Sequence, residues 1–362
     1  MIKKPMPWEL DDEDDNLPGF SEEFVNGADV WNQEIKLKPE LIEGVLREGH
    51  KMMLAGPSKA GKTFSLIELA ICISAGIPWM GRFNCSKGKV LYVNMELDKE
   101  SCKDRFFRIR EAMGLNDKKI FAPCMIWNLR GHVVPLNELT PAIIRRAKHK
   151  GYAAIIIDPI YKVLTGNENN AFQMAQFCNY FDRIAAECNC AVIYCHHHSK
   201  GDQSWKRSMD RASGSGVFAR DVDALLDMTE LELPQYRRRE GVTAWRVTGT
   251  LREFQAFPPV DVWFDYPLHV MEHFAPEENV APHHELPSYQ RAMNARKPKE
   301  QKLRERKRRL EAAYDICMVN GPVTVSTLAE YLGVSLDTIR RSVDEHPNFT
   351  RENGVVSWCR GG

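Results

Sequence analysis

A complete phosphate-binding loop constrains this chain more than any other feature. Residues 56–63 read Gly56-Pro57-Ser58-Lys59-Ala60-Gly61-Lys62-Thr63, which matches the pattern G-x-x-x-x-G-K-[ST]. The apolar run 51–55 predicts a buried strand before the loop, and residues 64–75 carry apolar side chains at helical spacing after it. Such a strand–loop–helix unit points backbone N–H groups and a helix N-terminus at a phosphate.

We therefore predict a nucleoside triphosphate site, with ATP and Mg²⁺ as its ligands. Lys62 would reach the β- and γ-phosphates, and the Thr63 hydroxyl would hold Mg²⁺. The binding residues are predicted to be Gly56, Pro57, Ser58, Lys59, Ala60, Gly61, Lys62, Thr63 and Phe64.

Length, charge and cysteine usage limit the class of protein. The 362 residues suggest about two domains, and the net charge of zero means that any nucleic-acid site must be local. The ten cysteines show no C-x-x-C pair, which indicates reduced thiols. Residues 9–15 hold six carboxylates, which is wrong for a signal peptide, and no apolar run approaches the roughly 18 residues of a membrane helix. We expect a soluble, cytoplasmic protein without a membrane partner.

Strand patterns alternate with helical ones in the first part of the chain, which predicts a doubly wound α/β core. The strands after residue 224 follow one another without helices and suggest an antiparallel extension of the sheet. Four of the expected strands are short and nearly all apolar, as central parallel strands should be: those over 125–128, 153–158, 191–195 and 224–229. The expected strands are Lys89–Asn94, Met125–Asn128, Ala153–Asp158, Ala191–Cys195, Ala224–Thr229, Trp245–Thr248 and Val260–Phe264, after a short amphipathic approach over 39–46.

The composition changes near residue 275. Residues 291–311 hold ten Lys or Arg against three Glu and predict a basic helical arm after a Pro-containing linker. We divide the chain into an acidic tail that we expect to be disordered (1–35), an ATPase domain (36–270), a linker and basic arm (271–311), and a small C-terminal domain (312–362).

The C-terminal pattern predicts a winged helix-turn-helix order. A helix over 312–319 and a strand over 323–325 precede two capped helices and a hairpin. Ser326 is expected to cap a helix that ends at Gly333, and Ser335 to cap the helix over 336–345. Asn353-Gly354 predicts a tight turn between the last two strands.

Carboxylates at strand ends supply candidates for ATP hydrolysis, which requires a carboxylate for the metal, a base for water and positive charge. Asp158 ends an apolar strand at the carboxyl edge of the sheet and is our candidate for the Mg²⁺ shell. Glu96 lies just past the strand 89–94 and would polarise the attacking water. The alternatives are a turn-capping Asp158 and a solvated Glu96 at a helix start.

Three consecutive histidines, His196 to His198, end another strand. Adjacent side chains of an extended chain point to alternate faces, which argues against a shared zinc ion and favours a sensor of the γ-phosphate. Lys200 begins a Gly- and Ser-rich loop over 201–216 that either contacts DNA or is simply exposed.

These residues together resemble the RepA-like branch of the RecA/DnaB-type ATPases, the hexameric replicative helicases and related ATPases of plasmids, phages and other mobile elements. The similarity rests on residues 56–63, 75–81, 88–93 with Glu96, the stretch 196–200, and 211–216, and it extends over about residues 38 to 265.

The resemblance implies a RecA-like core with Glu96 as catalytic carboxylate, Asp158 at the metal and His197 near the γ-phosphate. It also implies a basic finger from a neighbouring subunit in a K-x-R stretch. Here that stretch reads Thr250-Leu251-Arg252, without the Lys, so Arg252 is the candidate, with Arg220 and Arg211 as rivals.

The resulting hypothesis is an ATP-hydrolysing helicase or replication ATPase, a homo-oligomer and possibly a hexamer, that binds single-stranded DNA at its core and duplex DNA through its C-terminal domain. The alternatives are an ATP-switched recombination mediator, helicase loader or replication regulator without unwinding activity, and a small-molecule kinase. The kinase would leave residues 291–360 without a role.

Overall fold

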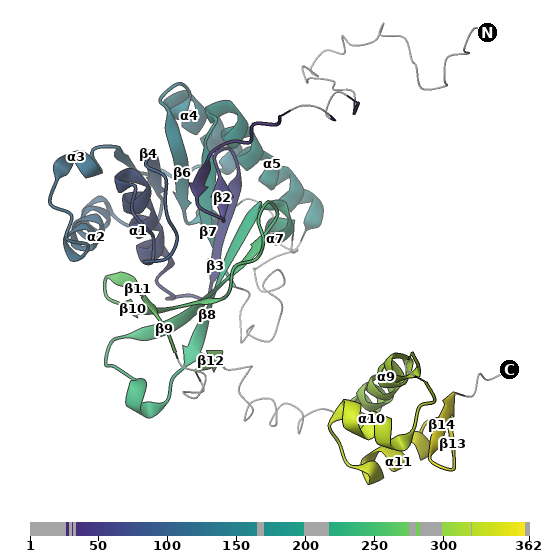
Figure 1. Ribbon diagram of the computed structural model, residues 1–362. Coiled ribbons are helices and arrows are strands. Elements are labelled where there is room, and N and C mark those ends of the chain that lie inside the picture. Colours follow the sequence, from purple (N-terminus) through teal and green to yellow (C-terminus); the bar gives the residue numbers. More distant parts are fainter. Residues whose placement is uncertain are drawn as a thin grey trace, which may run out of the picture. The chain divides into compact units, whose positions relative to one another are not determined.

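A single sheet of parallel and antiparallel strands forms the centre of the part of the chain between residues 51 and 282. The computed structural model describes residues 27–28, 31, 34–164, 170–198, 217–274, 280–282, 299–319 and 321–358. The strands follow the order β11-β10-β9-β8-β3-β7-β6-β4-β5 (Figure 1). They are β3 (Lys51–Gly56), β4 (Lys89–Asn94), β5 (Cys124–Asn128), β6 (Tyr152–Asp158), β7 (Ala191–His197), β8 (Ala224–Glu232), β9 (Thr243–Leu251), β10 (Val260–Asp265) and β11 (Leu268–Glu272).

Parallel and antiparallel pairing divide this sheet into two parts. Strands β8, β3, β7, β6, β4 and β5 are parallel. Strands β9, β10 and β11 continue the sheet in antiparallel fashion beside β8. The short strand β12 (Ala281–Pro282) also pairs with β8. The predicted α/β class and the antiparallel extension are confirmed, and the parallel-rich centre fits a RecA-like P-loop core.

Helices cover both faces of the sheet because alternate strand residues point to opposite sides. In β3, Met52 and Leu54 pack toward one core, whereas Met53 and Ala55 pack toward the other. Helices α1 (Lys62–Ala75), α2 (Lys99–Ala112) and α3 (Lys118–Phe121) pack on the first core. Helices α4 (Leu136–Ala147), α5 (Ala171–Cys188) and α7 (Val217–Asp221) pack on the second.

One expectation about this core is wrong. The strand over 125–128 was expected in the centre of the sheet, but β5 pairs only with β4 and forms the edge. Met125 is accordingly 49% exposed. The approach over 39–46 is an antiparallel hairpin of β1 (Glu40–Ile42) and β2 (Leu46–Arg47), which turns through Gly44 at φ 65°. A run of three apolar residues does not distinguish an edge strand from a central one, because the neighbouring strands are distant in sequence.

The C-terminal part consists of three helices followed by an antiparallel two-stranded hairpin. They are α9 (Lys299–Met318), α10 (Val325–Leu332), α11 (Leu336–Asp344), β13 (Phe349–Glu352) and β14 (Val355–Trp358). A separate hydrophobic core, drawn from residues between Leu310 and Val356, holds these elements together. The turn at Asn353 (φ 49°) and Gly354 (φ 80°) is left-handed at both positions, as expected for a tight hairpin.

The helix boundaries confirm some predicted caps and correct another. The Ser335 side chain accepts a hydrogen bond from the Thr338 N–H at the start of α11, and Gly333 ends α10 at φ 63°. The predicted strand over 323–325 is reduced to a single antiparallel bridge between Thr324 and Val355, because Val325 already belongs to α10. Ser326 is not its cap, since Thr324 accepts from the Thr327 N–H instead. The chain offers Thr and Ser two positions apart, and the sequence pattern does not choose between them.

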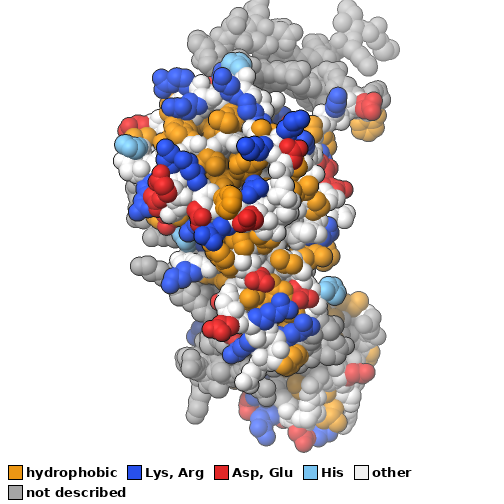
Figure 2. Space-filling view, turned by 90° about the vertical axis from the view of Figure 1, so that its left-hand side faces the viewer, with side chains coloured by type: hydrophobic (Ala, Val, Ile, Leu, Met, Phe, Trp, Pro, Cys, Tyr) orange, Lys and Arg blue, Asp and Glu red, His pale blue; other side chains and the backbone are white. Residues whose placement is uncertain are grey.

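No helix among the described residues is long and apolar enough to span a membrane. Figure 2 shows hydrophobic side chains interspersed with Lys and Arg on the face turned to the viewer. Phe107 of α2 is one of the large apolar side chains with substantial exposure, at 52%. The predicted loop residues Lys200 and 201–216, most of the acidic tail and residues 291–298 lie outside the described residues.

Candidate active site

The phosphate loop joins the carboxyl end of β3 to the first turn of α1. Lys59 (φ 66°) and Gly61 (φ 76°) both adopt the left-handed conformation, which gives the loop its tight curvature. Gly61 is the N-cap of α1 and offers no side chain to the first-turn N–H groups. Those N–H groups are therefore available to an anion, as in other phosphate loops.

The ammonium of Lys62 lies within the curve of the loop. It donates hydrogen bonds to the carbonyl oxygens of Gly56 at 2.8 Å and Pro57 at 2.7 Å. Its third contact is Nδ1 of His197, at 3.1 Å. A charged ammonium has donors only, so Nδ1 accepts and the His197 proton lies on Nε2. The pair thus fixes one tautomer of the histidine.

Burial disfavours the protonated form of both basic groups. Burial lowers the pKa of Lys62, while the carboxylates of Asp158 and Glu96 act in the opposite direction. Burial and the Lys62 charge lower the pKa of His197 to about 4. The imidazole is therefore neutral near pH 7 and presents a neutral N–H donor.

Asp158 ends β6 beneath the loop and is held by two protonated side chains. The Tyr92 hydroxyl donates to Oδ2 at 2.6 Å, and the Cys195 thiol donates to Oδ1 at 2.9 Å. Burial, together with the Asp158 charge, raises the pKa of both Tyr92 and Cys195. Both groups therefore remain donors, and the carboxylate of Asp158 is fixed in place.

A cavity of about 380 Å³ at the carboxyl edge of the sheet brings most of the predicted site residues together, but Gly56, Pro57, Ser58 and Arg252 do not line it. This volume lies within the roughly 300–1,000 Å³ of small-molecule sites. Residues from the loop, from the ends of β4, β6 and β7, and from α2 and β10 line it: Lys59, Ala60, Gly61, Lys62, Thr63, Phe64, Glu96, Leu97, Arg105, Asp158, Pro159, Cys195, His197 and Phe264.

Glu96 enters this cavity from beyond the end of β4, where it is exposed. The neighbouring Tyr161 follows Asp158 by three positions and belongs to the short helix η3 (Ile160–Lys162). Burial, the Glu96 charge and a hydrogen bond to Glu96 raise the pKa of Tyr161, so its hydroxyl donates to the carboxylate. The Tyr161 ring also lies 5.6 Å from that of His197. Tyr161 therefore connects the two residues that were predicted to act on the γ-phosphate.

The other two histidines of the triplet point elsewhere. His196 is buried beside the Phe218 ring, whose centroid is 5.3 Å away. His198 Nε2 lies 2.6 Å from Oδ1 of Asp227. Within the described part of the chain, no group of three His, Cys, Asp or Glu side chains is placed to hold a metal ion.

The chemistry of the donor set fits a nucleotide with Mg²⁺. The uncapped first turn of α1 and the Lys62 ammonium suit phosphate oxygens. Thr63 and Asp158 line the same cavity and offer the oxygen atoms that Mg²⁺ prefers. These two residues would hold the ion, which would supply Lewis-acid stabilisation of developing negative charge.

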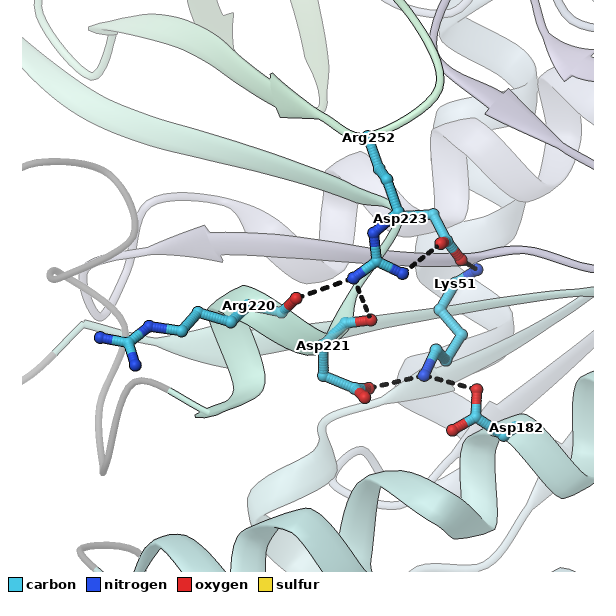
Figure 3. Close-up of polar contacts among 6 residues, drawn as sticks. All are labelled: Lys51, Asp182, Arg220, Asp221, Asp223 and Arg252. Carbon is cyan, nitrogen blue, oxygen red and sulfur yellow. Dashed lines mark hydrogen bonds and ion pairs between the residues drawn. The ribbon is translucent and has the colours of Figure 1, made fainter. Parts of the chain in front are cut away.

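Arg252 follows β9 and lies near the beginnings of β3 and β8, whereas the phosphate loop follows the end of β3. Figure 3 shows the contacts of Arg252. Its guanidinium donates to Oδ1 of Asp223 at 2.9 Å and to the carbonyl oxygens of Arg220 at 2.9 Å and Asp221 at 3.3 Å. Asp223 also accepts from the backbone N–H of Lys51, the first residue of β3, at 2.8 Å. Lys51 begins β3 and Gly56 ends it, so the length of this strand separates the Arg252 cluster from the phosphate loop. The structure does not bring Arg252 to the nucleotide site of its own chain.

Lys51 contributes its side chain to the same cluster. Its ammonium contacts Asp182 of α5 at 2.5 Å and Asp221 of α7 at 2.6 Å. The guanidinium of Arg220, by contrast, points away from the cluster in Figure 3, and only its backbone oxygen takes part.

Several site residues escaped the sequence analysis. Tyr161 could have been found, because it follows Asp158 closely at the same sheet edge. Tyr92 lies two residues before Asn94, which ends a predicted strand. It reaches Asp158 because β4 pairs with β6, and the sequence alone does not show this pairing. Arg105 of α2 and Phe264 of β10 carry no local signal, because packing of distant elements brings them to the cavity.

Comparison with a known protein family agrees with this geometry. Residues 24–203 match a family described as an AAA domain. Among solved structures, one described as an ATPase domain is similar over 62% of this chain and 85% of that domain, with 16% sequence identity and a TM-score of 0.42. The family match, the phosphate loop and the parallel-rich sheet support an ATP-hydrolysing P-loop enzyme.

Proposed function

We propose that this chain is an ATP-driven motor that acts on DNA, a ring-forming helicase or replication ATPase of the RepA-like kind from a mobile element. The observation that carries the proposal is that the phosphate loop, Glu96, Asp158 and His197 line one cavity. A phosphate cradle alone would serve any nucleotide-binding protein. A base candidate and a neutral histidine at the same cavity add the parts that hydrolysis and its control require.

In the proposed reaction, a water oxygen attacks the γ-phosphorus and the bond to the β–γ bridging oxygen breaks. Glu96 accepts the proton of the attacking water, and ADP leaves with the electrons of the broken bond. Lys62 exchanges loop carbonyls for phosphate oxygens. The Nε2–H of His197 donates to the γ-phosphate and transmits its presence along β7.

A positive charge from a neighbouring subunit would complete the site. Arg252 is engaged within its own chain by Asp223 and two carbonyl oxygens. Arg220 is exposed and directs its guanidinium away from that cluster, so we propose Arg220 as the better candidate for the finger. Arg211 lies outside the described residues.

The C-terminal part is proposed to act as a winged helix-turn-helix module that binds duplex DNA, while the ATPase core binds single-stranded DNA. The order of three helices and a hairpin supports this role. Arg340 and Arg341 of α11 are exposed, and α9 carries many basic residues. Phosphate contacts by such groups give sequence-independent affinity.

Hydrolysis and strand separation by the full chain test the proposal. ATP turnover should be stimulated by single-stranded DNA, lost in Lys62→Ala, and accompanied by unwinding of a forked duplex. Mass measurement with ATP and DNA should give a closed oligomer. Stimulated turnover without unwinding would favour the ATP-switched mediator, loader or regulator instead. Turnover that DNA does not change would contradict both.

A further inference from the structure

A buried acid–histidine pair lies behind the phosphate loop and is not part of the cavity lining. Glu68 of α1 and His269 of β11 have side chains that are 4% and 0% exposed. Glu68 Oε1 accepts from the His269 backbone N–H at 2.6 Å, and its Oε2 lies 3.0 Å from the ring Nδ1. One carboxylate therefore fixes both the backbone and the ring of His269.

The other side of the imidazole faces the loop. A methyl group built on Gly61 would lie 3.0 Å from Nε2 and 3.2 Å from Cε1 of His269, and 3.4 Å from Cδ2 of Phe264. The ring of Phe264 lies 4.7 Å from that of His269 and supports it from the side. The His269 ring thus occupies the space into which a side chain at Gly61 would project, directly beside the glycine that turns the loop into α1.

The hairpin of β10 and β11, which carries Phe264 and His269, also contacts Phe64, the residue that follows the loop. The ring of Phe64 lies 5.4 Å from Phe264 of β10 and 5.3 Å from Tyr266 in the β10–β11 turn. The loop end is therefore held at two points, behind Gly61 and against Phe64. Both points belong to the antiparallel extension, not to the parallel core.

We propose that His269 is a positioning residue for the phosphate loop: anchored by Glu68, its ring holds Gly61 and the adjoining N–H groups in the conformation that binds phosphate. This inference rests on the proposed ATP site. It assigns the β10–β11 hairpin a role in nucleotide affinity, although His269 does not line the cavity.

His269→Asn separates this role from simple folding. The Asn amide keeps a donor near the position of Nδ1 for Glu68, but it removes the Nε2 and Cε1 atoms behind Gly61. We expect KM and the dissociation constant for ATP to rise about tenfold or more and kcat to change less. Loss of buried ring atoms should lower the melting temperature, so the variants are compared well below their melting temperatures. Hydrogen exchange of residues 59–63 in nucleotide-free protein should accelerate. His273→Asn, at an exposed position four residues later, is the matched control and should change none of these values.

The outcomes distinguish this inference from the proposed function. If wild-type protein does not bind ATP, the proposed function fails, and exchange of the loop amides still tests the role of His269. An unchanged KM together with unchanged loop exchange in His269→Asn would overturn the inference. Should that variant not fold, Glu68→Gln, which weakens the anchor of the ring, must show the same rise in KM and the same faster exchange, or the inference is wrong.

Discussion

Nδ1 of His197 accepts a hydrogen bond from the Lys62 ammonium at 3.1 Å, so the lysine of the phosphate loop fixes the tautomer of the histidine at the end of β7. Lys62 comes from the loop after β3, and β3 pairs directly with β7. The two side chains meet because both strands end at the same edge of the sheet. Any movement of Lys62 toward a phosphate therefore changes the environment of His197.

The His197 environment makes folding stability depend on pH. Burial and the Lys62 charge lower its pKa from 6.5 to about 4, so between these values the unfolded chain binds more protons than the folded one. The contribution of this group to stability is complete above pH 6.5 and is lost as the pH falls toward 4. We expect His197→Asn to reduce the decline of unfolding free energy over this range.

Urea unfolding at a series of pH values measures this effect, with His132→Asn in an exposed loop as the control. An identical decline in wild type and His197→Asn would show that the histidine titrates normally in the folded protein. Because His197 is only partly buried, the comparison between variants is more informative than its absolute size.

Glu96→Gln should bind ATP and assemble but lower kcat by about a hundredfold or more, the scale for loss of a catalytic base. The substitution keeps an acceptor for the Tyr161 hydroxyl, so the cavity should keep its shape. Single-turnover hydrolysis and ATP binding measured on the same preparation separate chemistry from affinity. Glu100→Gln, at an exposed position in the first turn of α2, is the control. Turnover near the wild-type rate in Glu96→Gln would reduce Glu96 to a surface acid.

The phosphate site could be predicted because it is local in sequence. A loop between one strand and one helix, and an acid at the end of another strand, are each read from a few adjacent residues. Lys62, Thr63 and Asp158 accordingly line one cavity. Adjacent side chains of an extended chain point to alternate faces, so the three histidines were expected to have different surroundings. Of the three, His197 contacts Lys62.

Most of the missed features depend on contacts between distant elements. The Glu68–His269 pair joins residues 201 positions apart. The edge position of β5 depends on the pairing order of the sheet, which short apolar runs do not encode. The sequence around Arg252 suggested an arginine finger. Its ion-pair partner Asp223 could not be predicted, because the two residues meet only through the pairing of β9 with β8.

Substitution of the two arginines should separate a stabilising role from a role in hydrolysis. Arg252→Ala removes three hydrogen bonds at a half-exposed position and should lower the free energy of unfolding by about 1 kcal/mol. Arg220→Ala keeps the carbonyl oxygen that Arg252 uses, so it should leave stability nearly unchanged and lower DNA-stimulated turnover. Urea unfolding and ATPase assays on both variants test this pair of expectations.

A mixing experiment tests whether the arginine acts between subunits. Subunits with Lys62→Ala retain Arg220, and subunits with Arg220→Ala retain Lys62, so mixed oligomers contain some complete interfaces. Turnover should recover in this mixture beyond that of either variant alone. A second mixture combines Lys62→Ala subunits with Arg252→Ala subunits. Recovery of turnover in this second mixture alone would assign the finger to Arg252. No recovery in either mixture would contradict a finger from a neighbouring subunit.

The exposed arginines of α11 should contribute to duplex binding without ATP. Arg340 pairs with Asp337 at 2.9 Å on the surface, a contact that solvent weakens and that a DNA phosphate could replace. Behind them, Arg306 of α9 contacts the Ser342 hydroxyl at 2.7 Å and fixes the orientation of α11. The full chain carrying Arg340→Ala and Arg341→Ala should bind duplex DNA more weakly by roughly 1–3 kcal/mol if a base contact is lost.

The salt dependence of that binding decides what kind of surface α11 presents. Phosphate contacts release counterions, so affinity should fall steeply with salt, and the slope should become shallower in the double variant. Arg145→Ala with Arg146→Ala, an adjacent exposed pair on α4, controls for lost charge alone. Basal ATP turnover should stay intact in both double variants, because neither pair lines the cavity. If the Arg340/Arg341 variant binds duplex DNA like the wild type at every salt concentration, the C-terminal helices dock on protein and DNA is contacted by the ATPase core alone.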